Sequence, residues 1–166
     1  MLDTTQHIDE YCSQYLYKSA TSANLLVVAG ALLTSLYFYR ESGVTLILWL
    51  ALMLLIASTR ILITNFYFKD HRKNFAKRSI KQWVKIYTAS SLVCGCAWAS
   101  LILFLPAPAE AISINMVYIV YFATMAGSIT ALPVVLNAFY LYITPVFIAA
   151  FAYALTITGN ESYYLA

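Results

Sequence analysis

The longest uncharged stretch is the feature of this 166-residue sequence that most restricts its fold. Residues 111–160 form a run of 50 positions without Asp, Glu, Lys or Arg. A helix needs about 20 residues to cross the hydrocarbon core of a bilayer, so this run is far too long for one crossing and must fold back. Pro133 marks the turn, because proline interrupts a helix. The run predicts two membrane-spanning helices, over 111–131 and 136–157, and Pro145 predicts a kink in the second.

Composition supports the same fold class. Hydrophobic residues make up 62% of the chain and charged residues 10%, with a mean hydropathy of +0.75. Soluble domains average about 45–50% and 25%. One small core cannot hide so much apolar surface from water, which indicates lipid as the solvent for most of it. The few ionisable groups form no recognisable catalytic, phosphate-binding or metal-binding motif, so we expect no enzymatic activity, cofactor or metal in this chain.

Three more apolar runs come earlier in the chain, each long enough for one crossing: residues 19–39, 44–68 and 86–105. A polar turn at residues 40–43 joins the first two, and Pro106 and Pro108 close the third. The sequence therefore predicts an all-α, polytopic transmembrane helix bundle of about five spans over residues 19–166.

Arg60 is the single charge inside the second apolar run. About 26 Å of helical rise separate it from Gly43, which predicts a position near the far membrane interface. A guanidinium there can reach the headgroups along its flexible stem. This favours an interfacial anchor over the alternative, a buried functional charge.

The charge distribution predicts an orientation. All ten Lys and Arg residues precede Ile86, and seven of them lie in the connection 69–85 beside one acid, Asp70. Short basic connections stay in the cytoplasm, which predicts a cytoplasmic N-terminus in a bacterial inner membrane. Because the basic residues adjoin apolar runs, anionic lipid headgroups are the expected partner, and nucleic acid is not. The predicted membrane-surface anchors are Arg60, Arg72, Lys73, Lys77, Arg78, Lys81 and Trp83.

Residues 1–18 form a separate segment in this interpretation. Its apolar side chains fall on one helical face: Ile8, Tyr11, Cys12, Tyr15 and Leu16. The spacing predicts a short amphipathic helix along the cytoplasmic interface. Its acidic start leaves docking on the basic connection as an alternative.

Small residues recur every four positions in two of the predicted helices. The third helix carries Ser91, Gly95 and Ala99, and the fourth carries Ala123, Gly127 and Ala131. Helices in lipid associate by close backbone approach at such residues. The two stripes predict a seam between the third and fourth helices.

Polar and aromatic side chains inside the fourth and fifth helices raise a second possibility. The set is Asn115, Tyr118, Tyr121, Phe122, Asn137, Tyr140, Tyr142 and Thr144. Buried phenols need hydrogen-bond partners. The favoured interpretation is packing, with the hydroxyls bonded to neighbouring helices, and the alternative is a pocket for a small amphipathic ligand. Pro133 and Pro145 are the candidate hinges.

One order of features resembles a known class of membrane region. A long second helix ending in Arg60 and a basic stretch is followed by Trp83, Tyr87, Gly95 and Trp98, then Pro106, Gly127, Pro133, Phe139 and Pro145. Over residues 44–150 this order resembles the multi-span N-terminal region that precedes GGDEF diguanylate cyclase domains and histidine kinases in bacteria. The likeness is one of pattern and includes no diagnostic motif.

The resemblance implies a sensory or regulatory module that works as a homodimer and transmits a signal to a cytoplasmic output domain. That region typically has six spans, and five spans from a cytoplasmic N-terminus end outside the cell. We therefore expect a sixth helix and an output domain, a histidine kinase or a diguanylate cyclase, beyond residue 166. A pure membrane anchor or scaffold, or a small transporter or channel subunit, are the alternatives.

Overall fold

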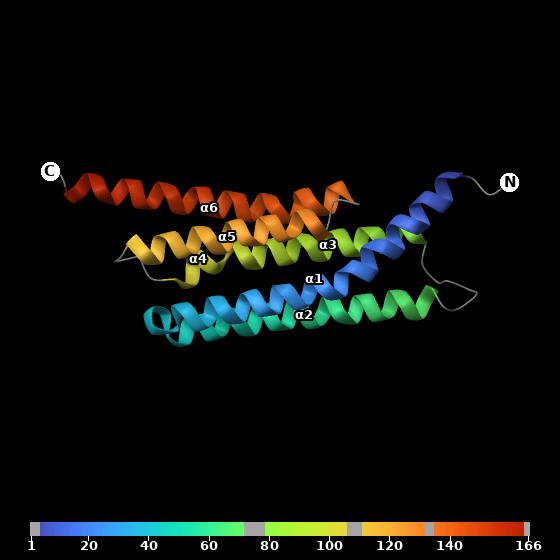
Figure 1. The fold of residues 1–166 in the computed structure, drawn as a ribbon, viewed down its shortest axis with the longest axis horizontal. Helices are drawn as coiled ribbons and strands as arrows, with labels where there is room; N and C mark the ends of the chain where they lie inside the picture. The colour runs from blue at the N-terminus through green and yellow to red at the C-terminus, as the bar shows by residue number, and fades with distance from the viewer. Residues whose placement is uncertain (1–3, 72–78, 106–110, 132–134, 165–166) are drawn as a thin grey trace.

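The computed structural model describes residues 4–71, 79–105, 111–131 and 135–164, and all regular structure in these ranges is helical. The helices are α1 (Thr4–Ser42), α2 (Val44–His71), α3 (Ile80–Ala99), α4 (Leu101–Phe104), α5 (Ala111–Ala131) and α6 (Leu136–Tyr164). They lie lengthwise against one another in an elongated bundle (Figure 1). The all-α prediction is confirmed for the described part of the chain.

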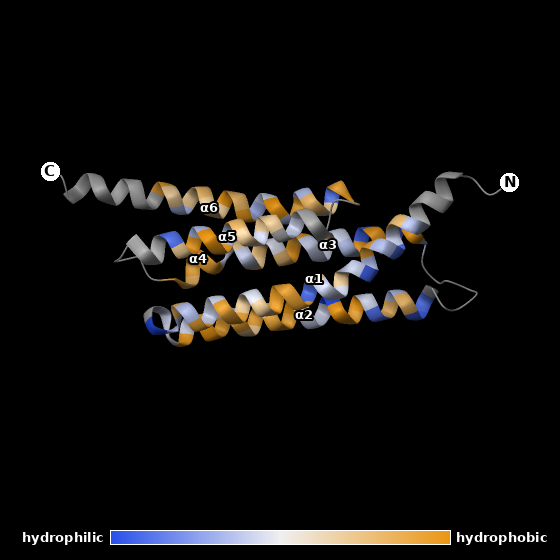
Figure 2. Ribbon diagram, in the orientation of Figure 1, coloured by the Kyte–Doolittle hydropathy of each residue, from blue (hydrophilic) through white to orange (hydrophobic). Residues whose placement is uncertain are grey.

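Four helical segments within the described ranges are long and apolar enough to cross a membrane: Tyr11–Arg40, Val44–Asp70, Ile80–Phe104 and Leu136–Leu155. A fifth apolar segment, Asn115–Ala126 in α5, is shorter. Hydrophobic residues dominate the middle of the bundle (Figure 2). By length and composition these helices fit a multi-pass membrane protein, and the count of five crossings stays a prediction.

Local sequence signals explain two of the helix boundaries. Gly43 has a φ of +54°, a left-handed conformation that favours glycine and lets α1 turn directly into α2. Ser79 forms a capping box with Gln82 and starts α3 at Ile80. The helix therefore starts six residues before the apolar run predicted to span the membrane at 86–105, and this cap is the reason.

No break separates the N-terminal segment from the first span, since α1 is one continuous helix. Its buried face consists of Ser13, Leu16, Tyr17 and Ala20. This face is rotated from the predicted one, because Tyr11 and Tyr15 are exposed. The Tyr17 hydroxyl donates to the Trp83 carbonyl oxygen at 2.9 Å, so polar partners as well as hydrophobicity determine which face packs. The segment packs against the ends of α2 and α3 that border the basic connection.

The closest helix pairs are α3 with α6 and α1 with α2, and α5 packs mainly on α6 and α1. A Cβ placed on Gly95 would overlap the Tyr142 carbonyl oxygen and lie 3.0 Å from the Tyr142 Cα. At Gly95 the predicted seam between the third and fourth helices is therefore wrong, because this residue of the α3 stripe faces α6. Small residues permit a close approach but do not choose the partner helix. Ala123 is exposed, and the surroundings of Gly127 and Ala131 lie outside the described residues.

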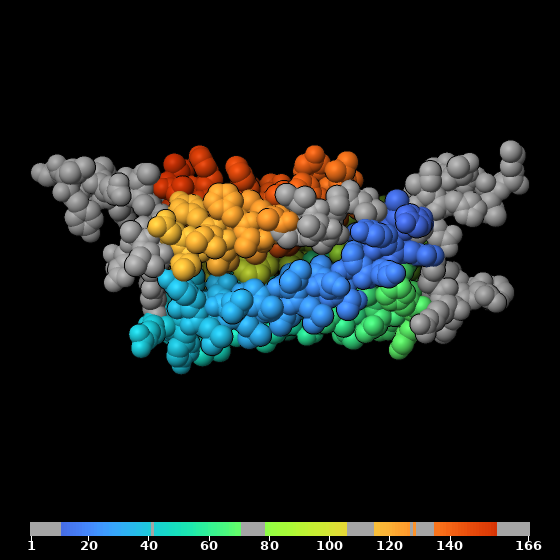
Figure 3. All heavy atoms as spheres, in the orientation of Figure 1, coloured from blue at the N-terminus to red at the C-terminus, as the bar shows by residue number. Residues whose placement is uncertain are grey.

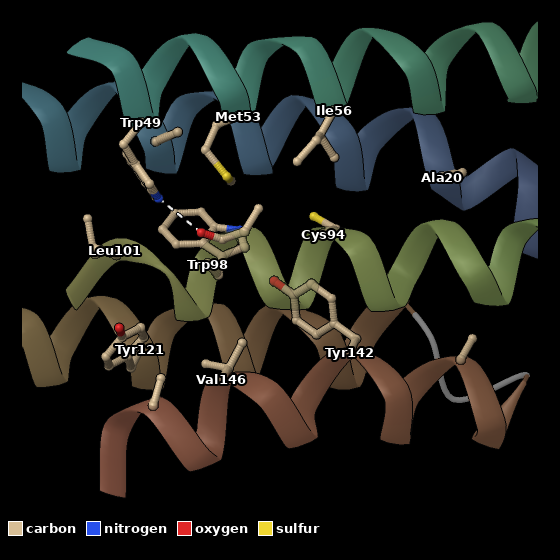
Figure 4. Packing of buried hydrophobic residues seen from close by; sticks show 14 of the residues in the cluster. Ala20, Trp49, Met53, Ile56, Cys94, Trp98, Leu101, Tyr121, Tyr142 and Val146 are labelled. Atoms are coloured by element: carbon tan, nitrogen blue, oxygen red, sulfur yellow. Dashed lines mark hydrogen bonds between the residues drawn. The ribbon is translucent and has the colours of Figure 1, made fainter. Parts of the chain in front are cut away.

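The junction between α3 and α4 is held by side chains from two other helices. Trp49 on α2 donates its indole N–H to the Ala97 carbonyl oxygen at 2.9 Å, drawn as a dashed line in Figure 4. The Tyr121 hydroxyl on α5 donates to the Ala99 carbonyl oxygen at 3.3 Å. Both bonds satisfy backbone groups where the helix is interrupted at Ser100.

Candidate functional site

Arg60 is buried inside the helix bundle, with 6% of its surface exposed. The prediction of an interfacial anchor is wrong, because it counted only the helical rise from Gly43 and not the apolar residues that follow Arg60. The helix α2 continues to His71, so about 15 Å of apolar helix separate Arg60 from Asp70. Side chains from other helices enclose the guanidinium, and the spacing of residues in the sequence cannot identify them.

The guanidinium of Arg60 is held by Tyr87 on α3. Its Nη2 donates to the Tyr87 hydroxyl at 3.2 Å, and its Cζ lies 5.2 Å from the centre of the same ring. Cys94 and Tyr142 are the other polar side chains beside it. Figure 4 shows Tyr142 on α6 pointing toward α3, which carries Cys94.

Arg60 has no acidic partner among the residues that the structure describes. Its Nε is buried and makes no hydrogen bond. A charged side chain at the centre of a membrane helix costs about 2.5–3.5 kcal/mol on insertion scales, and such residues mark functional sites. The arrangement leaves one positive charge and one free donor in an apolar interior.

Arg60 lines a cavity of about 670 Å³ that touches five helices. Most of the wall comes from α1, from Ser19 to Phe38, and from α5, from Met116 to Ser128. Trp98 and Tyr142 are the contributions of α3 and α6. Ligand sites typically measure about 300–1,000 Å³, so the cavity has the size of one.

Two further side chains on the cavity wall carry unsatisfied polar atoms. Asn24 is 1% exposed, and within the described ranges neither its amide nitrogen nor its amide oxygen has a hydrogen-bond partner. The indole nitrogen of Trp98 is also buried without a partner. A buried polar group without a partner costs about 1–3 kcal/mol. Together with Arg60, these groups can hydrogen-bond a polar ligand group, Asn24 as donor or acceptor and Trp98 as donor.

The cavity opens sideways between α1 and α5. Its wall includes Leu26 and Leu33 on α1 and Ile119 on α5, which are exposed, Leu26 to 67% and Ile119 to 57%. Figure 3 shows α1 and α5 next to each other on this face, with the α3 side of the bundle visible behind them. These rim residues lie in apolar helical segments, so in a membrane the opening would face the bilayer core.

Of the predicted pocket residues, only Tyr142 lines this cavity. Five others are exposed on the outside of α5 and α6: Asn115, Phe122, Asn137, Tyr140 and Thr144. Tyr118 packs edge-on against Tyr153, and Tyr121 bonds the Ala99 carbonyl oxygen. These seven therefore do not line this cavity. For Tyr121 the favoured interpretation, a hydroxyl bonded to a neighbouring helix, is confirmed.

Two residues that line the cavity were missed by the sequence interpretation, although one of them carries a signal. Asn24 is the only amide side chain within residues 19–39, and an amide inside a membrane helix needs an explanation. Trp98 gave no such signal, since a tryptophan near a helix end also suits the membrane interface.

Trp83 belongs to an aromatic cluster, which corrects its prediction as a membrane-surface anchor. The cluster consists of Tyr17, Tyr67, Trp83 and Tyr87, from α1, α2 and α3. Tyr17 and Tyr67 stack at 3.9 Å, and the Trp83 indole donates to the Asp70 carboxylate at 3.1 Å. Lys81 is exposed, as an anchor requires. Arg72, Lys73, Lys77 and Arg78 lie outside the described residues, as does Pro133.

The aromatic cluster connects the cavity to one end of the bundle. Tyr87 binds Arg60 with its hydroxyl and meets the Tyr17 ring edge-on at 5.3 Å. Ser13 and Tyr67 share a hydrogen bond of 2.9 Å one turn before Tyr17. A continuous set of contacts thus joins the guanidinium to the N-terminal part of α1.

Comparisons with known proteins add no information on the function of the Arg60 cavity. No family model, no curated protein and no solved structure matches the chain. The functional argument therefore depends on the site itself.

Proposed function

We propose that this chain is a sensory or regulatory membrane module of a bacterial signal-transduction protein. In this proposal it lies in the inner membrane with its N-terminus and basic connection in the cytoplasm. It acts as a homodimer on a cytoplasmic output domain, a histidine kinase or a diguanylate cyclase. The charge bias toward residues 69–85 supports the orientation.

The observation that carries the proposal is the burial of Arg60, with no acidic partner among the described residues, in a cavity shared by α1, α2, α3, α5 and α6. A simple anchor gains nothing from such a charge, which costs stability. A ligand that supplies the missing contacts would stabilise whichever arrangement of the five helices binds it better. The cavity therefore suits a protein that responds to occupancy.

The aromatic cluster supports a path from this site toward the cytoplasmic end. Movement of the Arg60 side chain changes its bond to the Tyr87 hydroxyl, and Tyr87 packs against Tyr17. A ligand that competes for the guanidinium would alter the packing of the N-terminal part of α1. Discrete rearrangements of this kind transmit signals between helices.

The natural protein that contains this chain provides the test. Arg60→Gln removes the buried charge, and Arg40→Gln removes an exposed arginine from the same membrane region as a matched control. We expect Arg60→Gln to lock the output enzyme in one activity state, whereas Arg40→Gln leaves the regulated range unchanged. Replacement of the whole segment by an unrelated membrane anchor should abolish regulation. If that replacement preserves regulation, the chain is only an anchor.

A further inference from the structure

We infer, as a deepening of the proposed sensory role, that the Arg60 cavity binds a membrane amphiphile with one anionic head group and a single apolar chain. The guanidinium would bind the head group, and the chain would lie in the groove between α1 and α5. A long-chain carboxylate is the simplest molecule of this class.

The charge of the site determines the head group. Arg60 supplies one positive charge and, in the described part of the protein, meets no carboxylate. Arginine binds carboxylate and phosphate oxygens with charge-assisted hydrogen bonds. Arg60 and Asn24 both line the cavity, and within the described residues the Arg60 Nε and the Asn24 amide are buried without a hydrogen-bond partner. A monoanionic head group would neutralise the charge, and a small shift of either side chain would let it bond these donors.

The shape and lining of the cavity determine the tail. Along α1 the wall extends from Ser19 to Phe38, about 28 Å of helix. Most of the wall opposite is apolar, with Met116, Ile119 and Val120 from α5. An elongated apolar groove leading from one buried cation matches an amphiphile with a single chain.

The position of the opening determines the route of entry. The exposed rim residues Leu26, Leu33 and Ile119 lie within apolar helical segments. A molecule dissolved in the bilayer reaches this opening directly. The apolar chain of an amphiphile concentrates it in the bilayer beside this opening, whereas a small water-soluble anion stays in water.

The test uses the protein in nanodiscs of zwitterionic phosphatidylcholine, with a hexadecanoate that carries a photoreactive diazirine in its chain as the probe. Unlabelled hexadecanoate, hexadecanol, lysophosphatidic acid and acetate serve as competitors. We expect hexadecanoate to compete at least about tenfold better than hexadecanol, since hydrogen bonds to a charged group are strong. Cross-links should map to α1 and α5, near Leu33 and Ile119.

The variants separate the head-group site from general lipid contact. Arg60→Gln should remove the preference for hexadecanoate over hexadecanol, and Arg40→Gln should keep it. Asn24→Leu should weaken hexadecanoate binding by several fold. Competition by lysophosphatidic acid and not by hexadecanoate would identify a phosphate head group within the same class. Competition by acetate alone, or equal labelling of the wild type and Arg60→Gln, would overturn the inference.

This experiment can fail independently of the proposed function. Specific binding at Arg60 without any change in the regulated output would leave the ligand class standing and remove the sensory role. If the output depends on Arg60 but the protein binds neither hexadecanoate nor lysophosphatidic acid, the sensory role stands and the proposed ligand class is wrong.

Discussion

The guanidinium of Arg60 on α2 is bound by the hydroxyl of Tyr87 on α3, at 3.2 Å, and lies 5.2 Å from the centre of that ring. A phenol can accept one hydrogen bond and offers its π-face, but it does not neutralise the charge. This contact therefore holds the Arg60 side chain in place without neutralising its positive charge. This combination distinguishes the site from a buried salt bridge.

Arg60→Met should not destabilise the empty protein and should raise its free energy of unfolding by up to about 3 kcal/mol. The reason is that methionine removes the cost of placing a charge inside a membrane helix. Denaturant unfolding in detergent micelles measures the change. A loss of more than about 1 kcal/mol would mean that the arginine serves the packing and not a ligand.

Gly95→Ala should destabilise the protein by about 1–3 kcal/mol or more, because the added methyl group meets the Tyr142 backbone and forces α3 and α6 apart. Gly30→Ala is the matched control. Its Cβ would contact the Trp98 ring at ordinary distances of 3.5 and 3.7 Å, so the change should stay below about 1 kcal/mol. Thermal unfolding of the two variants in the same micelle compares them. Equal stability of both would contradict the close contact between α3 and α6.

Tyr17→Ala should release the N-terminal part of α1 from the bundle. The variant loses the stack on Tyr67 and the hydrogen bond to the Trp83 carbonyl oxygen. We expect the amide hydrogens of residues 11–20 to exchange about tenfold faster or more, as in a locally opened segment. Hydrogen exchange read by mass spectrometry measures this, with the exposed Tyr15→Ala as control. Unchanged exchange in Tyr17→Ala would show that the cluster does not hold the segment.

Membrane orientation can be read from two single cysteines in a background without Cys12, Cys94 and Cys96. Val44 starts α2 and Ser79 precedes α3, and both side chains are exposed. Figure 1 shows the starts of α2 and α3 at opposite ends of the bundle. We expect a membrane-impermeant maleimide to label Val44→Cys in spheroplasts and Ser79→Cys only in inverted vesicles, because basic connections remain cytoplasmic. The opposite pattern would reverse the proposed orientation.

Much of the helical layout followed from the sequence. The polar turn ending at Gly43 and the helix over 111–131 agree with α1, α2 and α5 as observed. These features depend on local composition and on residues that interrupt helices, so neighbouring segments suffice to predict them. The early start of α3 at Ile80 was equally local, and the capping box Ser79-x-x-Gln82 was a readable signal for it.

The site could not be predicted in the same way. Arg60, Asn24 and Trp98 are separated by 36 and 38 residues along the chain, and no periodicity within one helix brings them together. The pocket was predicted from polar and aromatic residues in the uncharged run 111–160, yet five of those eight side chains are exposed. In a membrane both the lipid-facing and the buried surfaces of a helix are apolar, so hydrophobic pattern does not tell them apart.

The sequence by itself determined a helical membrane chain and its basic connection, because length, hydropathy and charge are properties of single segments. Only the tertiary structure decided that α3 pairs with α6 and that Arg60 faces a cavity instead of the interface. The reason is physical: helix pairing depends on the fit between surfaces, such as Gly95 against the Tyr142 backbone. The environment of a charge likewise depends on which helices surround it.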